Sequence, residues 1–204
     1  MRTCTCPVGT YMTSIGTQSC PSSFGQIQKV IFQRSGGLSS AGLGSSTTVL
    51  TYATWTALAA ATDASKIVVT PTVSGFTTEL GAAREFGTGN EVPNGVPIIF
   101  GTGPTKVTFK LYEPLSSLVR NLKALECETL QASFVNELGQ VAADETSSAA
   151  VTGFDIQSFH VSDRMLGGFD SPDYVEVSFS MPANWSKYFT IYTLSSGSML
   201  DITG

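Results

Sequence analysis

The chain has 204 residues, a formal net charge of −5, and charged side chains at only 13% of its positions, while 42% are hydrophobic. About a quarter of the residues of an average soluble domain are charged, so this composition indicates a surface that neighbouring subunits largely cover. The acidic balance argues against specific binding of nucleic acid, because a protein that grips the phosphate backbone needs clustered Lys and Arg.

The sequence divides into an N-terminal arm over residues 1–23 and a single β-rich domain over residues 24–204. The arm has little hydrophobic periodicity and many small polar side chains, which is typical of extended or poorly ordered segments. A clear strand is predicted over 25–34, where strand-forming apolar residues stand among polar ones. The Gly- and Ser-rich stretch over 35–46 then predicts a flexible loop.

A short helix is predicted over residues 54–64, with Thr54 as its N-cap, and a strand over 66–70 is ended by Pro71. The connection over 71–104 is rich in Gly, Pro, Asn and Thr and contains a Pro-Asn-Gly turn signal. A connection of about thirty residues is too long for a compact monomer unless it has a function. We therefore expect it to form an extended hairpin or arm.

Residues 105–112 alternate polar and apolar side chains without a break, which predicts a half-buried strand. Pro114 follows at a position suited to the first turn of a helix, and the helix is expected to end near Glu126. Its polar face carries Arg120 and Lys123. Its apolar face is formed by leucines spaced three and four residues apart: Leu115, Leu118, Leu122 and Leu125.

Strand alternation returns over 129–135, and residues 136–140 have the pattern of a hairpin turn, with Gly139 in the special backbone position. Further strands are predicted over 154–161, 174–181 and 188–194. Because strands and helices do not alternate regularly, a doubly wound parallel sheet is not expected. The order of elements predicts a mainly β protein: an antiparallel β-sandwich or barrel with one packed amphipathic helix and long loop or arm extensions.

The four cysteines raise the question of a metal site. A zinc interpretation would combine Cys4, Cys6 and Cys20 with either Cys127 or His160. However, the C-x-C spacing differs from the usual C-x₂-C, and no second ligand pair follows. We therefore expect no metal and no cofactor, with reduced thiols in the arm and Cys127 packed as a small hydrophobic side chain.

A catalytic site is not expected either. The single histidine, His160, lies in a predicted strand, and the chain has no G-x-S-x-G turn to present a nucleophile beside it. Asp163, Asp170 and Asp173 share a Gly-containing loop that could offer oxygen ligands to calcium, but their spacing is not that of a calcium-binding loop. We interpret them as solvated turn residues and the protein as a non-enzyme.

Several stretches together resemble virion structural proteins of tailed phages that infect Bacteroidetes-type bacteria. The stretches are residues 20–27, 80–90, 95–99, 166–173 and 181–186. In size and layout the chain is most similar to a major tail, or tail tube, protein. The resemblance implies a β-sandwich with one helix, assembled with copies of itself into hexameric rings. These rings would stack, with a long loop or arm projecting onto the next ring, into a tube through which DNA passes.

The resemblance also implies a location in the virion, after synthesis in the host cytoplasm, and contacts with other virion proteins. No apolar run approaches the roughly 20 residues that span a bilayer, and the first residues lack the apolar core of a signal peptide, so no membrane association is expected. Within the long connection, Arg84 and Glu85 are suited to a bidentate contact across subunits. Together with Asn90 they are the predicted interface residues.

Two alternatives to the tail tube remain open at this point. A cysteine-bearing arm departs from the tube fold, which keeps a capsid-decorating or head auxiliary protein of the same phages as the main alternative. The other is a sugar-binding adhesive β-module, for which Trp55, Trp185 and Tyr188 supply aromatic side chains. The position of Trp185 at a strand entry favours core packing for that residue.

Overall fold

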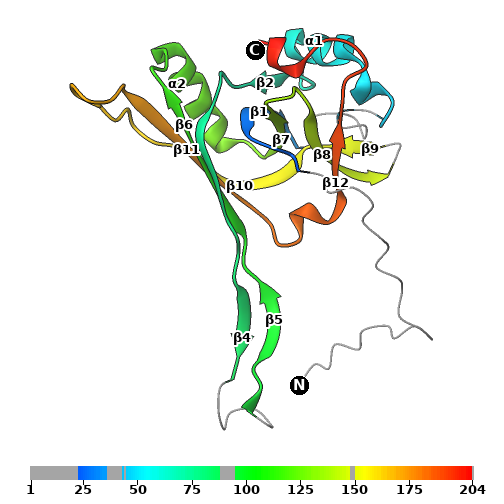
Figure 1. Cartoon of the computed structure of the whole chain (residues 1–204), viewed down its shortest axis with the longest axis vertical. Helices are drawn as coiled ribbons and strands as arrows, with labels where there is room; N and C mark the ends of the chain where they lie inside the picture. Colours follow the sequence, from blue (N-terminus) through cyan, green and yellow to red (C-terminus); the bar gives the residue numbers. More distant parts are fainter. Residues whose placement is uncertain (1–22, 36–42, 44, 88–94, 148–149, 204) are drawn as a thin grey trace.

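The computed structural model describes residues 23–35, 43, 45–87, 95–147 and 150–203. The predicted arm over 1–23 therefore lies, except for its last residue, outside the described residues. The described chain is mainly β, with large antiparallel sheets and two α-helices, which confirms the predicted fold class. Figure 1 shows a rounded body at one end and a long two-stranded hairpin that projects from it.

The strands and helices run as follows. The strands are β1 (Ile27–Arg34), β2 (Ile67–Val69), β3 (Ser74–Glu79), β4 (Ala83–Phe86), β5 (Ile98–Thr102), β6 (Thr105–Tyr112), β7 (Leu130–Asn136), β8 (Val141–Ser147), β9 (Ala150–Thr152), β10 (Phe154–Val161), β11 (Tyr174–Met181) and β12 (Phe189–Tyr192). The helices are α1 (Tyr52–Ala60) and α2 (Ser116–Ala124), with short 3₁₀ turns η1 (Thr48–Leu50), η4 (Leu125–Cys127), η5 (Trp185–Tyr188) and η6 (Met199–Asp201).

One strand, β10, belongs to both sheets of the body. Its first residues, 154–156, pair with β7, whereas 157–161 pair with β11. Within the second part Ser158 has a φ of 54°, and the register with β11 shifts between Gln157 and His160, so the strand bends at an irregularity of the β-bulge type. The ten strands of the body are hydrogen-bonded in one continuous sheet, which β10 divides into two layers. We call the layer of β2, β1, β7, β8, β9, β12 and the start of β10 the first sheet, and the layer of the rest of β10, β11, β6 and β3 the second sheet.

The main core fills the space between these two sheets. Aromatic side chains meet across it: the ring of Phe32 contacts that of Phe179, and Phe76 contacts Phe134. A second core lies on the outer face of the first sheet, where Trp55 of α1 and the C-terminal segment cover it. Because both faces of β1 are buried, its consecutive residues 30–32 are all apolar.

Both predicted helices are present, with corrected ends. Helix α1 begins at Tyr52 after the N-cap residue Thr51, so Thr54 lies inside the helix and the predicted cap is wrong. In α2, Leu118 and Leu122 pack against the main core as expected. Leu115 is the N-cap residue and is exposed, which corrects its assignment to the apolar face; its extended backbone turns the side chain out of the helix row.

The turn between β7 and β8 forms as predicted. Gly139 has a φ of 74°, a left-handed conformation that glycine adopts without strain. The side chain of Asn136 is fully buried there, donating to the carbonyl of Phe24 and accepting from the backbone N–H groups of Leu138 and Gln140. This network fixes the entry of the chain into β1 against the turn.

Candidate assembly surface

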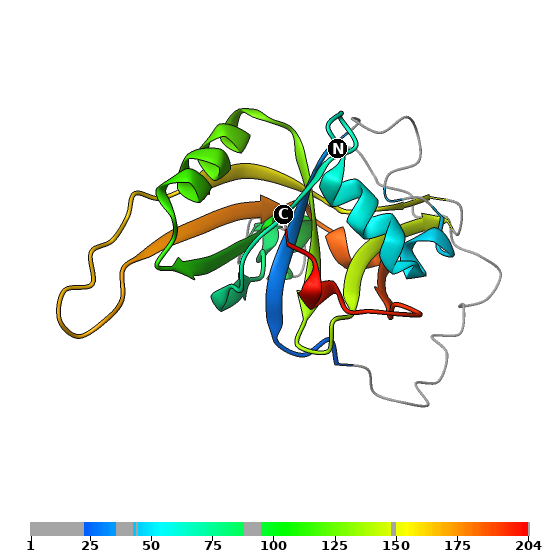
Figure 2. The ribbon, with the colours of Figure 1, turned by 90° about the horizontal axis from the view of Figure 1, so that it is seen from above.

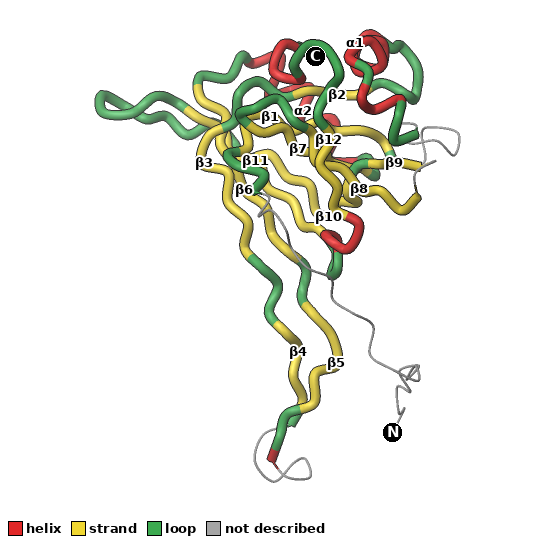
Figure 3. The backbone as a smooth tube through the Cα atoms, turned by 45° about the vertical axis from the view of Figure 1, so that its right-hand side comes forward, coloured by secondary structure: helices red, strands yellow, loops and turns green. Residues whose placement is uncertain are grey.

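The long connection over 71–104 forms a strand of the body and then a projecting hairpin. Strand β3 pairs with β6 in the second sheet, and the same two chain segments continue outward as β4 and β5, which pair only with each other. Figures 1 and 3 show this hairpin extending well away from the body. The expectation of an extended hairpin or arm is thus confirmed.

The hairpin is apolar although nothing in the described chain covers it. Its large apolar side chains are between 47% and 78% exposed, and they are Leu80, Phe86, Val96, Ile98, Ile99 and Phe100. Phe86 pairs with Ile98, and Glu85 pairs with Ile99, so the two pairs point to opposite faces of the ribbon. Both faces of the hairpin therefore present apolar surface to solvent.

The free energy gained by burying these side chains can be compared with the cost of bringing two subunits together. Fully burying one large apolar side chain contributes roughly 1.5–3 kcal/mol, so the six partly exposed ones offer on the order of 5–10 kcal/mol. Association of two proteins costs about 4–15 kcal/mol in lost freedom of motion. The two ranges overlap, so burial of one hairpin offsets much of the cost of association, and a subunit that makes one such contact and receives another gains twice as much.

The predicted interface residues fall on this hairpin. Arg84 and Glu85 are both exposed in β4 and have no ion-pair partner within the described part of the chain. Since they are consecutive in a strand, their side chains point to opposite faces of the hairpin. Asn90 lies outside the described residues. The prediction overlooked Ile99 and Phe100, whose consecutive apolar side chains in a turn-rich segment were the available signal.

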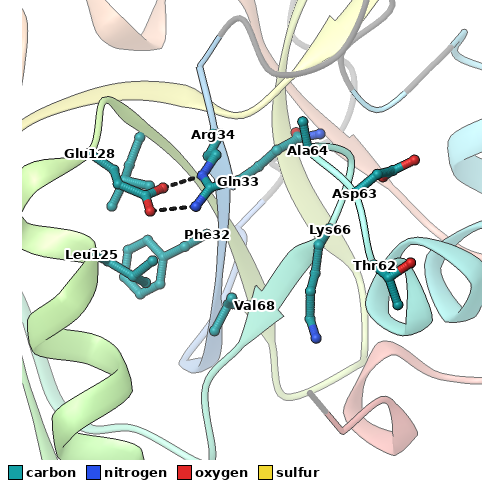
Figure 4. Close-up of a pocket in the computed structure, with 11 residues that line it drawn as sticks. Phe32, Gln33, Arg34, Thr62, Asp63, Ala64, Lys66, Val68, Leu125 and Glu128 are labelled. Atoms are coloured by element: carbon teal, nitrogen blue, oxygen red, sulfur yellow. Dashed lines mark hydrogen bonds and ion pairs between the residues drawn. The ribbon is translucent and has the colours of Figure 1, made fainter.

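Strand β2 and helix α2 lie at the end of the body opposite to the hairpin (Figures 1 and 3), and a groove between them is lined by residues of both. It consists of a cavity of about 220 Å³ and an adjoining one of about 300 Å³. The two cavities share Lys66, Val68 and Leu125 in their lining. Apolar walls come from Phe32, Val68, Leu125 and Leu130, and Figure 4 shows the first three facing one another.

A buried polar side chain without a hydrogen-bond partner lies beside the smaller cavity, on the opposite face of β1 from Phe32. Gln33 is only 3% exposed, and neither its amide nitrogen nor its amide oxygen has a hydrogen-bond partner among the described residues. Figure 4 shows this side chain extending toward Ala64, in the loop that leads from α1 to β2. An unpaired buried amide costs about 1–3 kcal/mol, so Gln33 lowers the stability of the fold.

Charged side chains surround the opening of this cavity. Arg34 donates two hydrogen bonds to the carboxylate of Glu128 (Figure 4), and this contact holds the pKa of Glu128 below its usual value. Lys66 is exposed and makes no ion pair with the described residues. Asp63 is engaged with the backbone N–H and hydroxyl of Ser65. The rim therefore has one cation available to an incoming carboxylate.

A second apolar projection is the loop between β10 and β11. Met165, Leu166 and Phe169 are exposed on it, and the backbones of Met165 and Tyr174 hydrogen-bond to each other at its base. Figure 2, which looks down from above, shows the loop reaching sideways from the body. The three aspartates predicted to be solvated turn residues lie in this loop: Asp163 and Asp170 are exposed, whereas Asp173 is half-buried and accepts a hydrogen bond from the backbone N–H of Gly167.

The two tryptophans considered for sugar binding pack against the fold, and the histidine considered for catalysis is exposed. Trp55 is buried and donates to the carbonyl of Val49, while Trp185 packs edge-on against Phe154, so neither presents an open stacking face for a sugar. His160 is exposed, with Nδ1 3.3 Å from Oε1 of Glu126.

Cys127 is exposed rather than packed, which corrects that prediction: the turn η4 ends beside the rim and points it outward. The other three cysteines lie outside the described residues. Within the described ranges, no three His, Cys, Asp or Glu side chains are grouped as metal ligands. No helix among the described residues is both long and apolar enough to cross a membrane.

Comparison with known proteins places the chain in no group. No family model matches it, and neither a curated protein nor a solved structure does.

Proposed function

We propose that this protein is a structural subunit of a tailed-phage virion that assembles with copies of itself into stacked rings, forming the tail tube through which DNA passes. The observation that carries the proposal is the projecting hairpin of β4 and β5, with six large apolar side chains exposed. A monomer gains nothing from such a surface, whereas a polymer buries it at every contact.

Two further properties support the proposal. The β-sandwich with a packed helix and a long arm agrees with what the resemblance to tail tube proteins implies. The net charge of −5 suits a tube interior that does not hold the passing DNA, because like charges repel its phosphates.

The test compares assembly of the full chain with that of a hairpin variant. Purified protein is followed by light scattering and negative-stain microscopy over a range of concentrations. We expect stacked rings or tubes from the parent protein, and only unstacked rings or monomers from the variant Phe86→Ser, Ile99→Ser, Phe100→Ser. Because these side chains are exposed, the variant keeps the urea unfolding curve of the parent.

A matched control is Leu138→Ser in the turn between β7 and β8, since Leu138 is 73% exposed, as much as the hairpin residues. It should assemble like the parent. If the parent stays monomeric at every concentration, the tube proposal is wrong, and a capsid-decorating protein that orders only on a capsid lattice becomes the better explanation. Equal assembly of parent and hairpin variant would also contradict it.

A further inference from the structure

We propose that the β10–β11 loop and the start of α2 form a docking site for a membrane surface, where two adjoining cavities bind a phospholipid headgroup that carries a phosphate and a primary amine. This inference goes beyond the proposed self-assembly and does not depend on it. It rests on the charges that line the two cavities and on the apolar side chains exposed beside them.

The first cavity is lined by cations. Its volume is about 400 Å³, and its charged lining residues are Arg120 and Lys123 of α2 and Arg164 of the loop, with no carboxylate among them. Residues three apart are neighbours on a helix surface, so the charges of Arg120 and Lys123 repel each other. Arginine and lysine are the side chains that bind phosphate oxygens, arginine through a fork of N–H donors. The lining therefore matches a phosphate group.

The acidic neighbours of these cations leave the cavity with a net positive charge. Lys123 donates to Asp163, whose side chain is 96% exposed, so this pair is a weak surface contact. Arg164 donates to a backbone carbonyl and lies 4.0 Å from the carboxylate of Asp173. Arg120 is exposed and has no ion-pair partner in the described part of the chain.

The second cavity carries the opposite charge. Its volume is about 500 Å³, and it adjoins the first, because Ser116 and Arg164 belong to both linings. Its carboxylates come from Glu113 and Asp173. Glu113 makes no ion pair with the described residues, and its φ of 46° is left-handed. Residues other than glycine adopt such a backbone at a cost, and they cluster at ligand sites.

Together the two cavities match a ligand with charges of both signs. A primary ammonium group donates three hydrogen bonds, which the carboxylates of Glu113 and Asp173 can accept. A purely anionic ligand would meet these carboxylates, and a purely cationic one would meet the three cations. Ethanolamine phosphate, with its phosphate and amine close together, satisfies both cavities.

The tip of the loop indicates that this headgroup belongs to a lipid surface. Leu166 is 74% exposed, Phe169 is fully exposed, and Met165 is exposed beside them. Gly168 lines the second cavity, so these apolar side chains adjoin the headgroup site. Burial of such side chains in the interfacial layer of a membrane drives the binding of peripheral proteins.

The surroundings of the tip favour a zwitterionic membrane over an anionic one. Asp163 and Asp170 are exposed in the same loop, and anionic lipids repel their charges. The backbone N–H of Gly167 donates to Oδ1 of Asp173 over 3.0 Å, which orders the loop before it meets a ligand. Such a surface contact needs no spanning segment, whereas the expectation of no membrane association concerned spanning segments and signal peptides.

The first experiment measures flotation with vesicles, in the background of the hairpin variant so that the exposed side chains of the hairpin do not contribute. Vesicles of phosphatidylethanolamine and phosphatidylcholine in equal parts should bind about tenfold more protein than phosphatidylcholine alone, whose quaternary amine donates no hydrogen bonds. Adding Leu166→Ser and Phe169→Ser should abolish flotation. Leu138→Ser, at a side chain 73% exposed, is the control and should not change it. Flotation of the loop variant like that of its parent would overturn the inference.

The second experiment measures binding of soluble O-phosphoethanolamine by equilibrium dialysis. We expect one molecule per subunit, bound about tenfold more tightly than inorganic phosphate. Arg120→Gln should weaken binding of both ligands by about tenfold. Glu113→Gln should weaken binding of O-phosphoethanolamine but strengthen that of phosphate, because a neighbouring negative charge is removed. A merely structural role of Glu113 would move both affinities in the same direction. Lys66→Gln, which removes an exposed cation elsewhere, is the control and should change neither.

The outcomes separate the parts of the inference from each other and from the tube proposal. If O-phosphoethanolamine binds but vesicles do not, the membrane assignment is wrong. If inorganic phosphate binds as tightly as O-phosphoethanolamine, or neither binds, the headgroup assignment is wrong. Equilibrium dialysis counts bound ligand per subunit in rings, tubes or monomers, so these results do not depend on assembly.

Discussion

At the scale of single residues, burial of the Asp144 carboxylate lowers the stability of the folded protein. It lies in β8, paired on one side with Phe189 of β12 and on the other with Thr152 of β9. One carboxylate oxygen is buried without a hydrogen-bond partner in the described chain. Burial raises the pKa of Asp144 above its usual value, and the negative charge of Asp155 raises it further.

The sign of this shift gives a prediction for Asp144→Asn. Because the folded pKa is raised, the ionised carboxylate costs stability, and the cost grows as the pH rises from the unfolded pKa of about 3.9 through the folded pKa. We expect the variant to be more stable than the parent by about 1 kcal/mol at about pH 7 and to match it at about pH 3. Urea unfolding at both pH values measures the difference.

A matched control is Asp170→Asn in the loop between β10 and β11, where the side chain is exposed. It should change the free energy of unfolding by less than about 0.5 kcal/mol at either pH. If Asp144→Asn destabilises the protein at neutral pH, the ionised carboxylate has a stabilising partner and the burial argument does not hold.

At the scale of elements, the hairpin depends on a narrow neck where it leaves the body. There Gly103 donates its backbone N–H to the carbonyl of Ala82, 2.9 Å away. A Cβ atom on Gly81 would lie 2.0 Å from the carbonyl oxygen of Gly103, so only glycine permits this approach of the two backbones. This close approach of the two backbone segments therefore determines the direction in which the hairpin leaves the body.

We therefore predict that Gly81→Ala weakens assembly. The added methyl group forces the two strands apart at the neck, and misdirection of the hairpin should raise the concentration needed for assembly by about tenfold, a loss of about 1.4 kcal/mol per contact. Light scattering across a dilution series measures it. Gly101→Ala is the control, because a Cβ there meets no atom within 4 Å. Assembly of Gly81→Ala at the parent's concentration would show that the neck tolerates the methyl group.

The sequence was most informative about elements with a regular hydrophobic pattern. The strands at 105–112, 154–161 and 174–181 were predicted with the bounds that the structure gives them, because each has one buried face and therefore alternates. Strands β8 and β9 were missed: their small and polar residues carry little periodicity, and tertiary pairing with β7 and β12 decides their conformation.

The candidate site was predictable in part. Length and composition of the 71–104 connection indicated a projecting arm, but the face exposed by each side chain depends on the register of β4 with β5, which includes a shift after Arg84. The groove could not be predicted. Its lining comes from β1, β2, the loop before β2 and the end of α2, and nothing in the local pattern around Gln33 indicates that its amide is buried without a partner.

At the scale of the whole molecule, the hairpin gives the proposed assembly a direction, because it projects from one end of the body (Figures 1 and 3). A contact between the hairpin of one copy and the body of another would be heterologous, since the two surfaces differ and each subunit carries one of each. Replacing the apolar side chains of the hairpin leaves a subunit that can receive a hairpin but cannot donate one.

This predicts the behaviour of the hairpin variant (Phe86→Ser, Ile99→Ser, Phe100→Ser) when it is mixed with the parent protein. The variant can receive the hairpin of a parent subunit, but growth stops at that end because the variant donates no hairpin of its own. At a constant concentration of parent protein, the polymers should therefore become shorter as the proportion of variant rises. Analytical ultracentrifugation measures the size distribution, and Leu138→Ser, which keeps the hairpin, is the control. Polymers that stay as long as those of the parent alone would mean that the hairpin is not the donated half of the contact.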